Sequence, residues 1–128
     1  MDYDCDLSFW GPVARADLER LYHSVFNPFS YRLEDFIQAV EDNEILYFHS
    51  VTEAEMVGFR TALLRSGMGF RLVWWIGRSK DTHCIIWDPA HNEHHRFEVI
   101  NGRLFAPVDA IECPNLRAQT LRGRDLYT

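Results

Sequence analysis

Lysine is almost absent from this chain of 128 residues: Lys80 is the only one among 13 basic residues. Lysine would serve as well as arginine on most exposed surfaces, so we interpret this bias as a property of the coding sequence. Long apolar runs are also lacking, and no stretch approaches the ~20 residues that a membrane span needs. The acidic start, Met1 to Asp6, lacks the basic region of a secretory signal. These absences predict a cytoplasmic protein that does not contact a membrane.

Closely spaced cysteine pairs are missing too. Cys5, Cys84 and Cys113 are an odd number and lie far apart in the sequence. They therefore do not form a disulfide framework of the kind found in small secreted domains. Buried, reduced thiols are expected, which agrees with a cytoplasmic location.

What the chain does contain is ample material for a hydrophobic core. Hydrophobic residues make up 47% and aromatic residues 14% of the sequence. This composition excludes intrinsic disorder, and the length is typical of one domain. We expect residues 1–128 to form a single α+β domain in which residues 115–128 are a loose or helical C-terminal tail.

Three helices are predicted in the first half. Apolar residues recur at helical spacing in residues 12–26 and again in residues 33–40. Ser30 is the expected N-cap of the second helix. Thr52 and Glu55 have the spacing of a capping box, which predicts the start of a third helix.

Strands are predicted mainly in the second half. They are expected at residues 5–10, 44–49, 70–76, 82–87, 96–100 and 103–106. Residues 90–95 are expected to be a polar, histidine-rich loop. The order of elements predicts an α+β fold: a mostly antiparallel sheet of about five strands with three helices packed on one face.

Asn101-Gly102 is the strongest turn signal, because these two residues favour the turn of a two-residue hairpin. Such a turn pairs Ile100 with Arg103 and Val99 with Leu104. One face of this predicted hairpin then faces the core, through Phe97, Val99, Leu104 and Ala106.

Candidate metal ligands gather between His83 and His95. This segment contains His83, Cys84, His91, His94 and His95, with Glu93 among them. Zinc accepts such ligands, but the side chains of two adjacent histidines point apart in an extended chain. We expect no metal, no other cofactor and no catalytic residues. The alternative is a small metal- or thiol-dependent enzyme that uses His83, Cys84 and the segment His91–His95.

A thiol-dependent enzyme needs a thiolate, an imidazole base and a group that orients the base. The run from His83 to Pro89 is similar to the histidine-strand region of papain-like peptidases. This resemblance implies His83 as the base and Asp88 as the orienting group. In that family the nucleophile stands at a helix N-terminus. Cys5 departs from this pattern, because it precedes a predicted strand and lies among three aspartates that would raise its pKa.

Charge is distributed unevenly along the chain. Residues 1–55 contain twelve acids and three arginines, a balance of −9, and the remainder contains ten basic residues and seven acids, a balance of +3. The net charge of −6 argues against direct nucleic-acid binding, because nucleic-acid-binding domains usually have a basic surface. An acidic face instead favours a protein or nucleoprotein partner with a basic surface.

We therefore expect a small, acidic, non-catalytic protein that binds and inhibits another macromolecule, as immunity proteins, antitoxins and phage anti-CRISPR proteins do. This expectation comes from the general profile of the chain. One of two consecutive tryptophans would anchor the interface, since neighbours in a strand point to opposite faces. The residues predicted to bind the partner are Glu34, Asp35, Glu41, Asp42, Glu44, Trp74 and Trp75.

Overall fold

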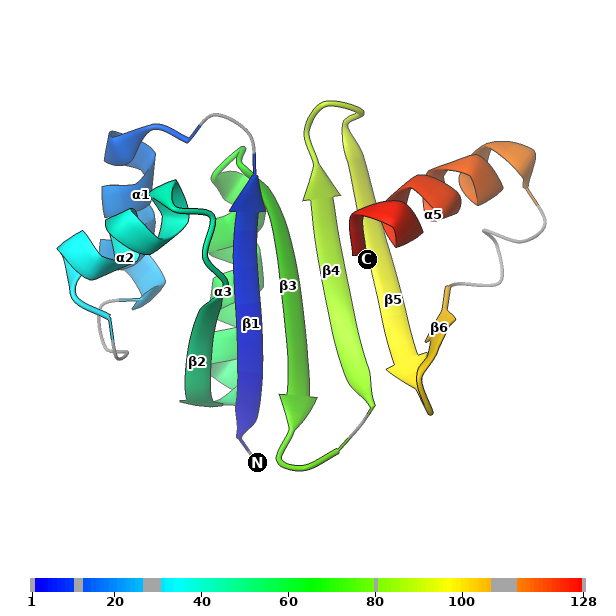
Figure 1. The fold of residues 1–128 in the computed structure, drawn as a ribbon, viewed down its shortest axis with the longest axis horizontal. Helices are drawn as coiled ribbons and strands as arrows, with labels where there is room; N and C mark the ends of the chain where they lie inside the picture. Colours follow the sequence, from blue (N-terminus) through cyan, green and yellow to red (C-terminus); the bar gives the residue numbers. More distant parts are fainter. Residues whose placement is uncertain (1, 11–12, 27–30, 80, 107–112, 128) are drawn as a thin grey trace.

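The protein is built around one antiparallel sheet, whose strand order is β2-β1-β3-β4-β5-β6 (Figure 1). The computed structural model describes residues 2–10, 13–26, 31–79, 81–106 and 113–127. The predicted α+β class is confirmed. In the described ranges there are six strands and four α-helices, against about five and three expected.

The elements follow one another closely along the chain. In order they are β1 (Tyr3–Trp10), α1 (Arg15–Leu21), a π-helical turn η1 (Tyr22–Phe26), α2 (Leu33–Glu41), β2 (Leu46–Val51), α3 (Glu53–Arg65), β3 (Gly69–Ile76), β4 (Thr82–Asp88), β5 (Glu93–Ile100), β6 (Arg103–Phe105) and α5 (Pro114–Tyr127). The expected cap at Ser30 lies outside the described residues, and α2 begins after Arg32 without a side-chain cap. Residues 115–128 were expected to be loose or helical, and their described part is helical.

The capping box that starts α3 is present. The Thr52 hydroxyl accepts a hydrogen bond from the Glu55 amide at 3.2 Å, and the Thr52 amide donates to the Glu55 carboxylate at 2.9 Å. These bonds satisfy two of the amides that a helix start leaves unpaired. Met56, Phe59 and Leu63 then form the buried stripe of the helix.

The predicted β5–β6 hairpin also forms, with Ile100 opposite Arg103 and Val99 opposite Leu104. Asn101 and Gly102 both have positive φ, as the turn requires. The prediction of a loop over residues 90–95 is wrong, because β5 already begins at Glu93. Its first residues alternate between buried and exposed, and the buried ones are polar, which conceals the strand from a hydrophobicity pattern.

One face of the sheet, called the α3 face, is covered by the N-terminal helices. Phe26 lies at the centre of this core, with its ring 4.8 Å from that of Phe48 and 4.6 Å from that of Phe59. From β1, Cys5, Leu7 and Phe9 point into it. Three helices therefore pack on one face, as expected.

The opposite face, called the α5 face, carries a second and smaller cluster made by Val73, Cys84, Ile86 and Phe97. Leu104 and Ala106 pack against it, so the predicted core side of the hairpin is confirmed. The fourth helix, α5, lies over this part of the sheet (Figure 1). The helices thus cover opposite faces at opposite ends of one sheet.

Contact between α5 and β5 depends on two adjacent residues of the helix. Arg122 donates two hydrogen bonds to the carboxylate of Glu93, which is 8% exposed. Gly123 packs closely against the ring of buried His95. A Cβ atom at residue 123 would lie only 2.4 Å from the ring carbon Cγ of His95. Because a buried ring has no room to move aside, only glycine fits at this position.

We expect Gly123→Ala to destabilise the protein by about 1–3 kcal/mol, the usual cost of overpacking. Gly58→Ala in α3 is the matched control, since its Cβ would meet only Val25, at 3.9 Å. The control should gain up to about 1 kcal/mol, because alanine favours a helix. Urea unfolding measures both changes. Equal effects of the two substitutions would contradict the tight contact at His95.

Acid is expected to loosen the same region. Burial lowers the pKa of His95 below 6.5, although Glu93 and Asp88 oppose the shift, and the hydrogen bond from Arg122 lowers the pKa of Glu93 below 4.5. In both cases the unfolded chain takes up the proton at a higher pH than the folded chain does. Stability is therefore lost as pH falls from 6.5 through the folded pKa of His95, and again from 4.5 through that of Glu93.

Urea midpoints measured between pH 7.5 and pH 3.5 test this expectation. His95→Gln should reduce the loss that begins near pH 6.5 and keep the one near pH 4.5, and His94, whose pKa burial also lowers, accounts for the upper loss that remains. His23→Gln, a substitution at an exposed histidine, should keep both. An unchanged upper loss in His95→Gln would show that another group causes it.

Candidate functional site

The five acids predicted to bind a partner all lie on the surface of α2 or in the turn that follows it. Glu34 is paired with Arg15 at 2.6 Å, and Asp42 accepts a hydrogen bond from Gln38 at 3.0 Å. No ion pair with Asp35, Glu41, Asp42 or Glu44 is found within the described residues. The negative charge of α2 and its turn is therefore only partly compensated.

The two consecutive tryptophans have very different surroundings. Trp74 is 5% exposed on the α3 face, between the ring of His83 at 5.5 Å and the guanidinium of Arg60 at 5.3 Å. Trp75 is half-buried on the α5 face, with its ring 6.4 Å from that of Tyr47. Only Trp75 is placed where a partner can reach it.

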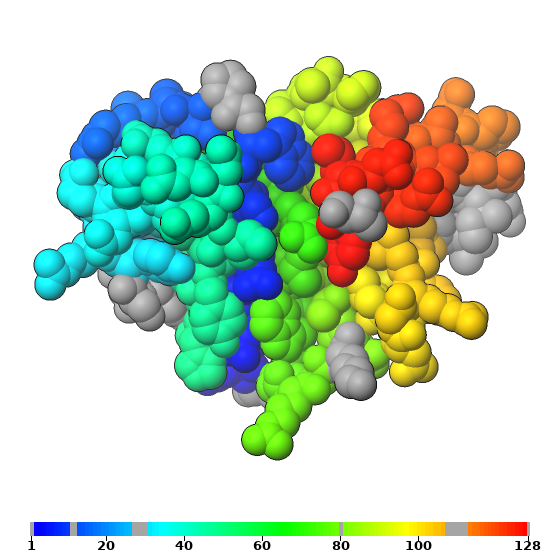
Figure 2. Space-filling model, viewed as in Figure 1, coloured from blue at the N-terminus to red at the C-terminus, as the bar shows by residue number. Residues whose placement is uncertain are grey.

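A surface that the sequence reasoning missed lies beside Trp75. It is the part of the α5 face that α5 leaves uncovered, and we call it the open face: Asp4, Asp6, Tyr47, His49 and Trp75. Figure 2 views the molecule from this side, with β1 (blue) and β3 (green) visible between the β2 end and α5 (red). Three strands therefore contribute carboxylates and aromatic rings to one continuous surface.

The two carboxylates of the open face differ in their partners. Asp4 contacts the Nδ1 of His49 at 2.6 Å. Burial raises the pKa of Asp6, the charge of Arg71 opposes this shift, and the charge of Asp4 adds a smaller increase. No hydrogen bond to Asp6 is found in the described part of the chain. Asp6 is thus a partly desolvated carboxylate whose charge is partly offset by Arg71, without an ion pair between the two groups in the described residues.

Alternation in β1 could have revealed this surface. Cys5, Leu7 and Phe9 are apolar, and Asp4 and Asp6 lie between them. A period of two places the aspartates together on the face opposite the core. The sequence carried no comparable signal for Tyr47 and Trp75, which reach β1 from two other strands.

Arg71 marks the border between the open face and α5. Its guanidinium lies over the ring of Tyr127, 4.7 Å from the centroid. Its charge also acts on Asp6 and on buried Cys84. The stacking on Tyr127 holds this cation beside α5, at the side of the open face away from β2.

The histidines do not converge on a metal site. His83 and His94 extend to the α3 face, whereas Cys84 and His95 extend to the α5 face. His91 contacts Asp88, with 2.8 Å between Nδ1 and Oδ2. In the described ranges of the chain, no group of three or more histidine, cysteine or acidic residues could hold a metal ion.

The thiols are poorly suited to nucleophilic chemistry. Burial raises the pKa of both Cys5 and Cys84 to about 12, so both stay protonated at neutral pH. His83 and Asp88, the base and orienting group implied by the peptidase resemblance, point to opposite faces of β4. Asp88 instead contacts His91. The arrangement needed for a catalytic triad is therefore not formed by these residues.

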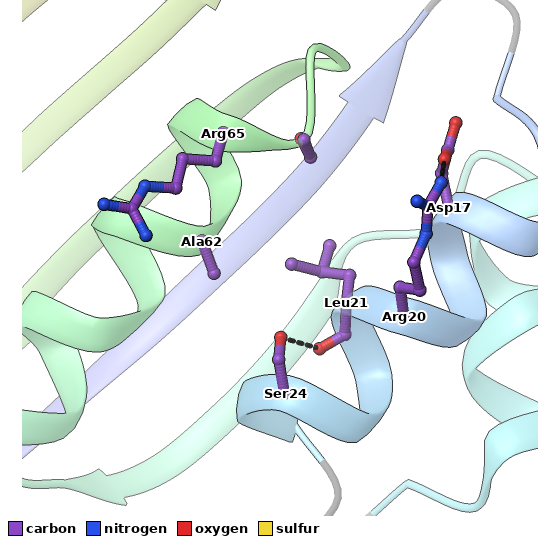
Figure 3. A pocket seen from close by; sticks show the side chains of 7 residues that line it. Asp17, Arg20, Leu21, Ser24, Ala62 and Arg65 are labelled. Carbon is purple, nitrogen blue, oxygen red and sulfur yellow. Dashed lines mark hydrogen bonds and ion pairs between the residues drawn. The ribbon is translucent and has the colours of Figure 1, made fainter.

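A groove of about 360 Å³ lies between α1, η1 and α3 (Figure 3). Its hydroxyl groups are already engaged: Ser24 donates to the Leu21 carbonyl at 3.0 Å, and Ser66 donates to the Leu63 carbonyl at 2.6 Å. Arg20 is paired with Asp17, and Arg65 extends away from Ser24 in Figure 3. The polar groups of the groove do not point toward a common centre.

Comparison with known proteins finds no matching family model, no matching curated protein and no matching solved structure. Among the described residues, no helix is both long enough and apolar enough to cross a membrane.

We expect one of the three thiols to react much faster than the others. Cys113 is half-buried, whereas Cys5 and Cys84 are each 0% exposed with raised pKa values. A thiol-specific disulfide reagent at pH 8 should label one cysteine quickly, and the other two only when the protein unfolds. Cys113→Ser should remove the fast phase. Fast labelling of Cys84 in the native protein would contradict its burial beneath α5.

Proposed function

We propose that this chain is a non-catalytic protein that binds and inhibits another macromolecule by occupying its basic surface. Immunity proteins, antitoxins and anti-CRISPR proteins act in this general way, and the proposal assigns the chain to that kind of activity. The observation that carries it is the exposed negative charge of α2 and its turn, where Asp35, Glu41 and Glu44 have no ion-pair partner among the described residues.

The strand order turns the uneven charge of the sequence into an uneven charge of the molecule. Residues 3–51 supply β1, β2, α1 and α2, which lie together at one end of the sheet (Figure 1). Residues 77–128, which include β4, β5, β6 and α5 at the opposite end, contain seven basic and seven acidic residues and so carry no excess of negative charge. An acidic end of this kind attracts a basic partner over about a Debye length and orients it before contact.

Exposed aliphatic and aromatic side chains next to the acids favour a protein as the partner. Ile45, which directly follows Glu44, is 59% exposed, and Tyr47, three residues after Glu44, is 46% exposed. A buried aromatic anchor surrounded by polar and charged residues is the usual arrangement of a protein interface. The charges would orient the partner as it approaches, and burial of Ile45 and Tyr47 against it would stabilise the complex.

The edge of the sheet at β2 favours recognition through side chains over strand addition. The outward amide of Tyr47 donates a hydrogen bond to the hydroxyl of Tyr31 at 3.1 Å. A partner strand would have to displace this bond at the second residue of a six-residue strand. The open edge is therefore a poor template for another strand.

Charge reversal tests the proposal. Glu41→Lys with Glu44→Lys changes the acidic end, and Glu98→Lys with Asp125→Lys makes the same change in net charge at the opposite end, all at exposed positions. Each tagged variant is used to capture proteins from the lysate of its native host at low and at raised salt. The wild type and the variant with Glu98→Lys and Asp125→Lys should retain a stoichiometric partner that the variant with Glu41→Lys and Glu44→Lys loses.

The captured partner is then assayed for binding to nucleic acid or to its own substrate, with and without added protein. Loss of partner activity in a one-to-one mixture, relieved by raised salt, is the expected result. A partner retained equally by both charge-reversed variants would remove the assignment to α2. Partner activity that is unaffected by the bound protein would show binding without inhibition.

A further inference from the structure

The open face is an uncovered part of the sheet whose chemistry is more specific than negative charge. Asp6 lies opposite Tyr47 in one direction and opposite Val73 in the other, and Asp4 lies opposite Trp75. The ring of Tyr47 reaches across β1 to within 6.4 Å of Trp75, with 34° between the ring planes. Two carboxylates of one strand are therefore flanked by two aromatic rings from its neighbours.

We propose that the open face is the docking site for an arginine side chain of the basic partner, held between the carboxylates of Asp4 and Asp6 and the rings of Tyr47 and Trp75. This inference rests on the proposed function, because it names the group of the partner that the acidic end would recognise. The occupant is argued from charge complementarity and from the geometry of the rings.

The carboxylate of Asp6 is the group of the open face that would attract a cation. This carboxylate is partly desolvated, lies beside the like charge of Asp4, and has no hydrogen-bond partner within the described residues. Keeping such a carboxylate ionised costs stability unless a cation approaches it. Arg71 approaches from within the chain, but its guanidinium is stacked on Tyr127 at the border of the site.

The rings favour arginine over lysine as the occupant. A guanidinium is planar, stacks on aromatic faces and can still donate hydrogen bonds in its plane to carboxylates. The protein itself shows the stacking twice, with Arg71 over Tyr127 and Arg60 over Trp74. Tyr47 and Trp75 present comparable rings at the open face, and no arginine is stacked on either of them in the described part of the structure.

A short acetylated Gly-Ser peptide with one central arginine is the probe. Its citrulline counterpart has the same shape without the charge, and its lysine counterpart has the charge without the planar group. Binding is followed by two-dimensional NMR of the labelled full chain, with the indole signal of Trp75 assigned by its loss in Trp75→Phe. The arginine peptide should shift the Trp75 indole and the amides of Tyr47 and Asp6, and the other two peptides should bind more weakly.

Asp6→Asn is the main variant and is expected to bind the arginine peptide about tenfold more weakly, since it removes a charge-assisted hydrogen bond. The same substitution should raise the urea midpoint, because it removes a partly buried charge. A residue with only a structural role would not combine greater stability with weaker binding. Tyr47→Ala, at a 46% exposed position, is a second variant that does not disturb the core.

The outcomes separate this inference from the proposed function. Shifts confined to α2, equal binding of the citrulline peptide, or unchanged binding by Asp6→Asn and Tyr47→Ala would each overturn the arginine site. If Asp6→Asn still captures the cellular partner while Glu41→Lys with Glu44→Lys does not, the proposed function stands and the arginine site falls. If the peptide binds at the open face but no partner depends on α2, the arginine site stands alone.

Discussion

Both hydrophobic clusters of the protein depend on β3, the strand that lies between them. Phe70, Leu72 and Trp74 point into the larger core beneath α3, and Val73 points into the smaller cluster beneath α5. A strand that is buried on both faces reads as a continuous apolar run, which is what residues 72–76 show. Since β3 pairs with β1 on one side and β4 on the other, the N-terminal helices and α5 are attached to one sheet through this strand.

Covering opposite faces at opposite ends leaves part of the α5 face uncovered on β1. On β1 the consequence is direct: one side of the strand is entirely within the core, and the other presents Asp4 and Asp6. Apolar residues at these two positions would give a more stable domain. Carboxylates there are consistent with a surface used for binding, because residues that serve binding commonly lower the free energy of unfolding of a domain.

The polar residues beneath α5 have a different role from those of the open face. Glu93 and His95 are buried where β5 starts, and Arg122 and Gly123 of the helix fit against them. Ion pairing compensates the buried carboxylate, and the missing side chain of Gly123 admits the imidazole ring. The histidine-rich segment thus contributes to the attachment of a helix, and its chemistry is engaged within the fold.

Features that depend on a few neighbouring residues were predictable from the sequence: the capping box at Thr52, the turn at Asn101 and the opposite directions of Trp74 and Trp75. Charge asymmetry and the exposure of the acids on α2 also follow from local composition and helical spacing. Only the tertiary structure decided that Trp75 is the more accessible of these two tryptophans, that α5 covers the second face, and that Asp6 lies beside Tyr47. Periodicity assigns a side chain to one face of its own strand, whereas strand order and helix placement, which depend on contacts between distant residues, decide what covers that face.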